Sequence, residues 1–222
     1  MDWSVVIDRL PQLASGLFQT LWLCALSAVA AIAIGVGMAA ANMRGSHLLR
    51  QAVALYTAIC LGLPLLILIY ILFYALPLYG VTLAPKVVGV SALAIYYGPY
   101  FSGIMRSAMD AIPSGQSEAA KAIGLSRART LWRVQLPQAL PLMLPSGVGL
   151  LIGMLKDSAL LAVVSVPEFM FHAREAVSDT YASVEIYSTV ALVYWCLSTL
   201  CVAAASRLER KLAAPAAYLT RL

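Results

Sequence analysis

The amino-acid sequence predicts an all-α, polytopic membrane protein with five transmembrane helices. Three observations support this fold class. The chain of 222 residues is 62% hydrophobic and only 11% charged, whereas a soluble domain carries about 25% charged residues. Long uncharged intervals separate the groups of charged residues, and each interval is long enough for one membrane-spanning helix of about 20 residues. The sequence outside these intervals is too short for a separate soluble domain.

The uncharged intervals place the five expected spans within a single transmembrane domain that covers residues 1–222. We expect the spans at residues 16–41, 51–76, 86–111, 140–164 and 186–208. Pro64 lies inside the second of them, where it should kink or break the helix because proline lacks the backbone N–H. The segment that contains Pro77, Gly80 and Pro85 is typical of a turn, and it should connect the second span to the third.

Lysine and arginine are unevenly divided between the two sets of loops that five spans would create. One set holds eleven of these residues and the other holds three. Because basic residues gather in cytoplasmic loops, we expect the N-terminus outside the cell and the C-terminus in the cytoplasm. The loop of residues 112–139 then faces the cytoplasm. The basic residues lie beside apolar spans rather than along one soluble face, so the net charge of +5 does not indicate a nucleic-acid partner.

Residues 112–139 contain more structure than a simple connector needs. The alanine-rich stretch before Gly124 favours a helix, and Gly124 suits the left-handed position that ends one. Ser126 can cap a second short helix, which Leu136 and Pro137 should terminate before the chain returns to the membrane. From periodicity alone, this pair of helices predicts either a docking surface for a protein or an amphipathic element on anionic lipid.

The loop also carries a spaced motif. Glu118-Ala119-Ala120 is followed by Gly124 after three residues, and after nine more residues by Val134, Gln135, Leu136 and Pro137. This pattern resembles the cytoplasmic "EAA" loop of ABC importer permeases, in which the Val134 position is usually isoleucine. The resemblance implies the type I importer permease fold with a coupling-helix loop. It also implies that the ATPase-coupling residues are Glu118, Ala119, Ala120, Gly124, Val134, Leu136 and Pro137.

Motifs elsewhere in the chain resemble the polar amino-acid uptake branch of these permeases, the branch of histidine and glutamine permeases. They are Leu17–Leu21, Ile112–Gln116, Leu155–Leu160, Val166–Glu168 and Glu185–Tyr187. The second span departs from that branch, because Leu61-Gly62-Leu63-Pro64 replaces the usual Arg-Gly-Thr-Pro. The third span has Gly103 where an acidic residue is common. These departures predict a different solute or an asymmetric pair of permeases, and they favour a heterodimer over a homodimer.

The resemblance implies a bacterial inner-membrane protein that imports an amino acid or a related small polar solute such as an opine or ectoine. The expected partners are separate ABC ATPase subunits, an extracytoplasmic solute-binding protein, and a second permease that is either a copy or a paralogue. The chain has no phosphate-binding loop with a Gly-Lys pair, so ATP and Mg²⁺ should bind to the partner ATPase and not to this chain. The alternative function is a gradient-driven transporter or a channel that needs no ATPase.

A few polar residues lie within the expected spans. Charges in hydrocarbon are costly and usually face a bundle interior or a wet cavity. Lys156 and Asp157 are therefore expected either to form a solute gate or to join a structural network. Tyr96 and Tyr100 share one helical face, where they would either contact the solute or pack in the interior of the bundle. Pro64 is the remaining residue of the candidate solute path. No catalytic residues and no metal site are predicted, because the four cysteines and two histidines lack ligand spacing.

Overall fold

The computed structural model describes residues 2–219, and all regular elements within this range are helical. The long helices are α1 (Ser4–Arg44), α2 (His47–Gly62), α4 (Pro85–Asp110), α7 (Leu136–Asp157) and α9 (Ser183–Leu219). The shorter α-helices are α3 (Leu65–Tyr70), α5 (Ser114–Ala122), α6 (Arg127–Thr130) and α8 (Phe169–Thr180). Two π turns, η1 (Ile71–Ala75) and η3 (Leu131–Gln135), and two 3₁₀ segments, η2 (Leu76–Tyr79) and η4 (Ser158–Val164), complete the set.

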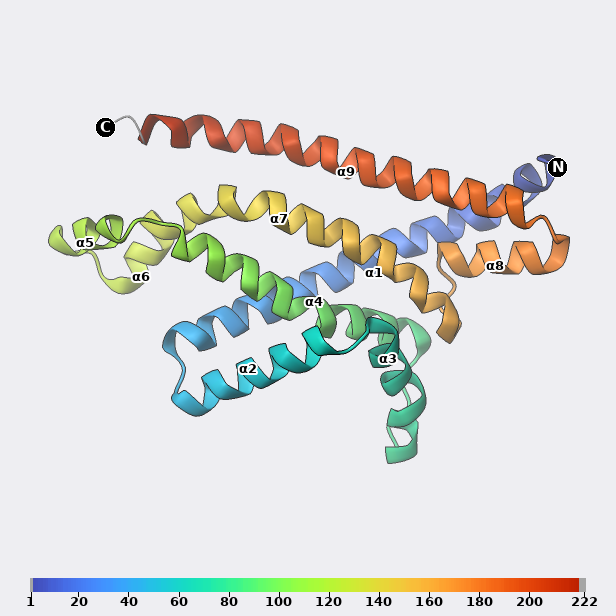
Figure 1. The fold of residues 1–222 in the computed structure, drawn as a ribbon, viewed down its shortest axis with the longest axis horizontal. Helices are drawn as coiled ribbons and strands as arrows, with labels where there is room; N and C mark the ends of the chain where they lie inside the picture. The colour runs from blue at the N-terminus through green and yellow to red at the C-terminus, as the bar shows by residue number, and fades with distance from the viewer. Residues whose placement is uncertain (1, 220–222) are drawn as a thin grey trace.

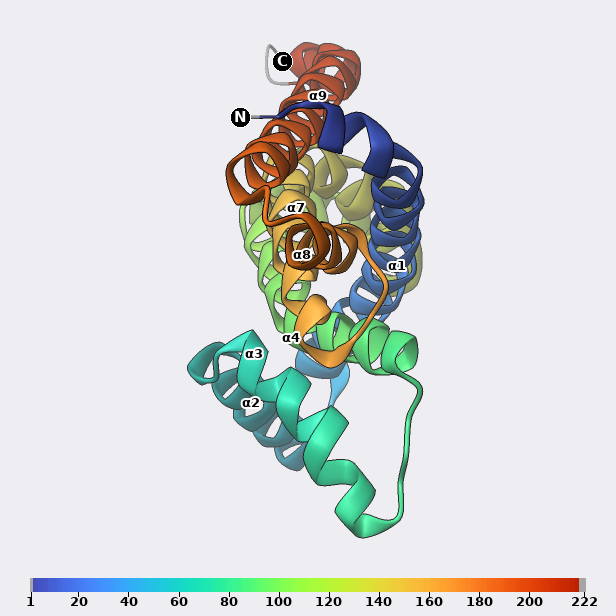
Figure 2. The same cartoon turned by 90° about the vertical axis from the view of Figure 1, so that its right-hand side faces the viewer.

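The four long helices α1, α4, α7 and α9 run along the long axis of the molecule (Figure 1). Helices α5 and α6 lie at one end, together with the end of α9, and α8 lies at the opposite end, close to the starts of α1 and α9 (Figures 1 and 2). We call these the knuckle end and the α8 end. Helix α1 begins at the α8 end and α9 finishes at the knuckle end, which is the arrangement that an odd number of spans requires.

Four stretches are long and apolar enough to cross a membrane, namely Ser4–Met43, Pro85–Asp110, Arg127–Val164 and Ser183–Leu208. A fifth crossing exists if α2 and the following Leu65–Tyr79 segment count as one span, although the two are bent by 106°. The prediction of five spans is therefore confirmed in number, with one broken span. Helix α1 begins well before the predicted start at residue 16, because Pro11 is accommodated inside the helix.

Pro64 breaks the second span rather than only bending it. Leu63, the residue before the proline, has the extended φ of −104° and ψ of 137°, as expected from the clash with a proline ring. Pro64 is also extended, with ψ of 137°, and α3 starts only after it. Helix α3 packs on α4 through Leu65 and Ile69, and Figure 2 shows the segment that follows it projecting away from the other helices.

The prediction that Leu136 and Pro137 end the second short helix of residues 112–139 is wrong. Helices α6, η3, α7 and η4 follow one another without a break from Arg127 to Val164. Pro137 lies in the first turn of α7 directly after the π turn η3. A π turn shifts the carbonyl that a proline ring would otherwise meet in a regular helix, so the chain stays helical through the proline.

The segment before the last expected span contains a further helix, α8, which the sequence did not predict. Its buried face, Phe169, Ala173 and Ala176, packs with Leu13 of α1 and Ile186 of α9 in one apolar cluster. A second, central cluster joins α1, α3, α4, α7 and η4 around residues such as Leu93, Ile69, Met154 and Leu161. Burial against two neighbouring helices stabilises α8 although its length is only 12 residues.

Candidate functional site: a knuckle and a polar cluster

The knuckle, residues Ser114–Gln135, is a compact turn between two helical arms. Gly124 has the left-handed φ of +79°, which glycine adopts without a steric penalty. The Gly124 N–H donates to the Lys121 carbonyl at 2.9 Å, and the Leu125 N–H donates to the Ala120 carbonyl at 3.0 Å. This pair of bonds is the Schellman pattern that ends a helix. The predicted left-handed Gly124 is therefore confirmed.

The two arms of the knuckle are held together by a side-chain bond. Gln135 Nε2 in η3 donates to Ser117 Oγ in α5 at 2.9 Å. The Ser126 hydroxyl caps α6 by accepting from the Arg129 N–H, as the sequence predicted. Ala120 and Thr130 are buried between the arms. The knuckle is thus a folded unit rather than a flexible connector.

The predicted coupling residues divide into a buried set and an exposed set. Ala120 packs inside the knuckle, and Val134 and Leu136 are half-buried, whereas Glu118, Ala119, Gly124 and Pro137 are exposed. Large apolar side chains stand beside the exposed set, because Ile123 and Trp132 are 77% and 71% exposed. Exposed aromatic and aliphatic side chains flanked by charges are typical of a protein docking surface.

A polar cluster, formed by Tyr96, Tyr97, Tyr100 and Asp157, joins α4 to α7. Tyr97 Oη of α4 donates to Asp157 Oδ2 of α7 at 2.8 Å. The Tyr97 ring lies 5.6 Å from the ring of Tyr96 and 5.9 Å from that of Tyr100. The sequence predicted that Asp157 either forms a gate or joins a structural network but did not identify Tyr97 as its partner, since a contact across 60 positions leaves no local signal.

Lys156 and Pro64 lie apart from this cluster. Lys156 is exposed and lines a cleft of about 440 Å³ together with Ala191 and Trp195 of α9. Within the part of the chain that the structure describes, Lys156 forms no ion pair. Pro64 is exposed at the break between α2 and α3, where the next residue, Leu65, packs in the central cluster with Tyr97.

A cleft of about 570 Å³ extends from Tyr100 toward the knuckle end. Its walls come from α2, α4 and α7, and none of its lining residues is charged. Leu61 and Gly103, two of the three positions that depart from the uptake-branch pattern, line it together with Tyr100, whereas Leu63 does not. The polar groups it offers are hydroxyls, on Thr57, Tyr100, Ser107 and Ser146.

A buried carboxylate joins α1 and α8 at the opposite end of the molecule. Thr20 Oγ1 of α1 donates to Glu168 Oε2 at 3.1 Å, and the Phe169 N–H donates to the same hydroxyl at 3.0 Å. Glu168 Oε1 accepts from the Phe171 N–H at 2.7 Å and so caps α8. Glu168 is fully buried, and burial raises the pKa of its carboxyl, against the opposing effect of the Phe171 N–H and the Thr20 hydroxyl. We call Thr20, Glu168, Phe169 and Phe171 the α1–α8 joint.

Glu168 belongs to the Val166–Glu168 motif, but the sequence predicts no structural role for its side chain. The signal that was available is the Pro-Glu pair before an apolar stretch, because a carboxylate at that position can cap a helix. Among the described residues, no group of three or more histidine, cysteine, aspartate or glutamate side chains could hold a metal ion.

Comparison with known proteins identifies the class to which this arrangement belongs. Residues 31–214 match the family described as binding-protein-dependent transport system inner membrane component. The L-cystine transport system permease protein TcyB of Bacillus subtilis (strain 168) is 32% identical over 214 residues, which cover 96% of this chain and 92% of that protein. The glutamine transport system permease protein GlnP of Escherichia coli (strain K12) is 30% identical over 213 residues, covering 95% and 97%.

The fold is also found in a solved structure, described as the crystal structure of an amino acid ABC transporter with histidines. Its TM-score is 0.89 at 29% identity, and the match covers 95% of this chain and 99% of that one. The chain therefore belongs to the family of binding-protein-dependent transport system inner membrane components. It is an ABC importer permease subunit with the type I fold. These similarities support the ATP-driven function and not the gradient-driven alternative.

Proposed function

We propose that the protein imports an amino acid or a related small polar solute and receives the energy of ATP hydrolysis through the knuckle. Separate ATPase subunits bind and hydrolyse the ATP, and an extracytoplasmic binding protein delivers the solute. The observation that carries this proposal is the knuckle itself, in which the left-handed Gly124 presents Glu118, Ile123 and Trp132 on an exposed surface. The relatives named for glutamine and L-cystine transport support an amino acid as the solute.

The knuckle transmits motion because it is rigid. The Gln135–Ser117 bond fixes one arm to the other, and η3 continues into α7 without a break. A displacement of α5 by an ATPase subunit therefore tilts the whole Arg127–Val164 helix. Alternating access follows when the ATP-bound and ATP-free states of the ATPase favour different tilts.

The knuckle end faces the cytoplasm in this proposal. The basic residues of the knuckle, Lys121, Arg127, Arg129 and Arg133, give this end the larger positive charge. The α8 end then faces the binding protein. The N-terminus is outside the cell and the C-terminus is in the cytoplasm.

The solute path runs past Tyr96, Tyr100, Asp157 and the Pro64 break. Irregular backbone at membrane depth is tolerated only when protein covers it or when it lines a wet cavity. Pro64 and Gly62 are exposed in the single chain, so this corner meets either the second permease or the water-filled path. The cleft that extends from Tyr100 toward the knuckle end provides the inner part of that path. Lys156 serves as a candidate gate charge at the outer part.

The second permease is a paralogue rather than a copy. The inner cleft of this chain holds only hydroxyl and apolar groups. A carboxylate or ammonium group of an amino acid needs a charge-assisted partner when it leaves water. A partner chain with charged side chains in the matching cleft would supply it.

The proposal is tested by purifying the tagged chain from its host in mild detergent and identifying the proteins that accompany it. An ATPase subunit and a second, different permease are the expected result. Recovery of the chain alone, under conditions that keep another ABC importer intact, would contradict the ATPase coupling. Recovery with the ATPase but only with copies of itself would contradict the paralogue while leaving the coupling in place.

A further inference from the structure

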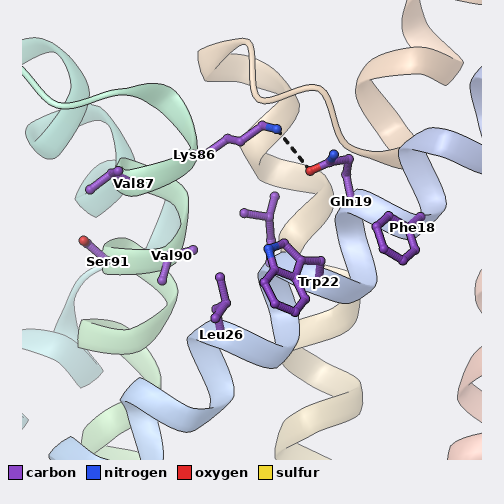
Figure 3. Close-up of a pocket in the computed structure, with 9 residues that line it drawn as sticks. Phe18, Gln19, Trp22, Leu26, Lys86, Val87, Val90 and Ser91 are labelled. Carbon is purple, nitrogen blue, oxygen red and sulfur yellow. Dashed lines mark hydrogen bonds between the residues drawn. The ribbon is translucent and has the colours of Figure 1, made fainter.

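A laterally open groove lies between α1 and α4, on the side of the bundle nearer the α8 end. It has a volume of about 560 Å³. Figure 3 shows Lys86 and Gln19 at its upper rim and Trp22, Leu26 and Val90 below them. We propose that this groove binds one anionic phospholipid, with its phosphate at Lys86 and an acyl chain between α1 and α4.

The rim of the groove offers hydrogen-bond donors and an uncompensated positive charge. Lys86 Nζ donates to Gln19 Oε1 at 3.2 Å (Figure 3). The amide oxygen of Gln19 is neutral, so this bond does not balance the charge, and an ammonium has two further donors. None of the nine residues that line the groove is acidic, and Lys86 forms no ion pair within the described range. An anion with several oxygen acceptors fits this rim, and a phosphate group is such an anion.

The lower part of the groove is apolar and exposed on the side of the bundle. Phe18 and Trp22 of α1 are 68% and 55% exposed, and Leu26 is 41% exposed. Leu23, which is 2% exposed, closes the back of the groove. In a chain that spans a membrane, such side chains meet lipid acyl chains rather than water.

The depth of the groove matches that of one lipid leaflet. From Phe18 to Leu26 the α1 backbone rises by about 12 Å at 1.5 Å per residue. Half of the hydrocarbon core of a bilayer is about 15 Å thick. Lys86 lies in the first turn of α4, and Trp22 adds an aromatic ring next to it. Basic and aromatic side chains at the end of a span are typical of the headgroup level.

The test is native mass spectrometry of the intact transporter complex, titrated with dioleoyl-phosphatidylglycerol or dioleoyl-phosphatidylcholine. Both lipids carry phosphate and identical chains, and only the first has a net negative charge. The wild type should bind the phosphatidylglycerol about five-fold more tightly, the contribution of one basic residue near the surface. Lys86→Gln should abolish this preference, so that the two lipids bind about equally tightly, and Lys86→Arg should retain it.

Two further variants separate the groove from general surface effects. Arg174→Gln removes an exposed charge of α8 at the same end of the molecule and should leave the preference unchanged. Leu26→Trp fills the groove and should weaken the binding of both lipids. A wild-type preference in Lys86→Gln, or wild-type binding in Leu26→Trp, would overturn the proposal. Cross-linking between two permease chains through a cysteine at Val87 would also overturn it, because the groove would then be a permease interface.

Discussion

The knuckle and the α1–α8 joint lie at opposite ends of the molecule and are built in opposite ways. The knuckle is exposed, and its bonds connect residues at most 18 positions apart, as in the Gln135–Ser117 pair. The joint is buried, and its bonds connect Thr20 to Glu168 and Phe169 across 148 and 149 positions. The knuckle presents an exposed surface, whereas the joint fixes α8 to the first span.

This difference shows which structural features can be predicted from the sequence and which cannot. A left-handed glycine, a serine cap and a spaced motif are local features, so the sequence alone predicts the turn of the knuckle. A buried carboxylate with a distant hydroxyl partner follows only from packing. The same difference predicts that changes in the knuckle affect coupling, whereas changes in the joint affect stability.

The largest expected effect is that of Gly124→Val on transport. A β-branched residue resists the left-handed φ of +79°, at a cost of about 1–2 kcal/mol, and the two arms should change their angle. Solute uptake should be lost while the ATPase subunits still hydrolyse ATP. Reconstituted vesicles in which uptake and hydrolysis are measured together check this. Gly124→Asn is the matched control, since asparagine tolerates the left-handed region. Normal uptake by the valine variant would remove the basis of the coupling hypothesis.

Thr20→Val should have the next largest effect, on stability. The variant keeps the shape of the side chain but leaves Glu168 without one donor and the Phe169 N–H without its acceptor. Each unsatisfied buried group costs about 1–3 kcal/mol, so thermal unfolding in detergent should occur at a clearly lower temperature. Thr199→Val is the control, because the exposed Thr199 hydroxyl only bonds the Trp195 carbonyl of its own helix. Equal melting temperatures for the two variants would show that the joint does not stabilise the fold.

Tyr97→Phe tests the polar cluster, which resembles the joint in its long-range bonding. The variant keeps the ring contacts and removes only the donor to Asp157. We expect a loss of about 1 kcal/mol in stability together with a reduced uptake rate. Tyr187→Phe, on a partly exposed face of α9, should change neither quantity. A lower stability with unchanged uptake would indicate that Asp157 is structural and does not belong to the solute path.

The pH dependence of stability should reveal the buried state of Glu168. Burial raises the pKa of this carboxyl above its ordinary value of 4.5. A raised pKa in the folded state gives stability that is fully present below pH 4.5 and is lost as the pH rises through the folded pKa. Relative to Glu168→Gln, the wild type should therefore become less stable as the pH increases above this range. Parallel melting curves of the two proteins at all pH values would contradict the prediction.

Asp110→Asn should have the smallest effect. The Arg106–Asp110 pair is an i, i+4 contact at 3.6 Å, and both side chains are more than 70% exposed. Exposed pairs of this kind contribute about 0.3–0.5 kcal/mol. The melting temperature should stay within the error of measurement, and a shift as large as that of Thr20→Val would mean that this pair has an unrecognised partner.

The sequence by itself determined the number of apolar spans, the site of the break at Pro64, and the turn at Gly124. Each of these depends on hydrophobic length or on the backbone limits of one residue. It did not determine that the helix continues through Pro137, because the π turn η3 that permits this is a property of the packed chain. Nor did it determine α8, whose 12 residues are too few to be stable alone.

Only the tertiary structure decided which polar groups meet. Tyr97 bonds Asp157, Thr20 bonds Glu168, and Lys156 lines a cleft to which its neighbour Asp157 does not contribute. Adjacent residues on a helix point in different directions, and their partners come from spans far away in the chain. The physical reason is that a sequence specifies which residues must be buried and where the chain must turn. The packing of the helices against one another then determines which groups each buried side chain contacts.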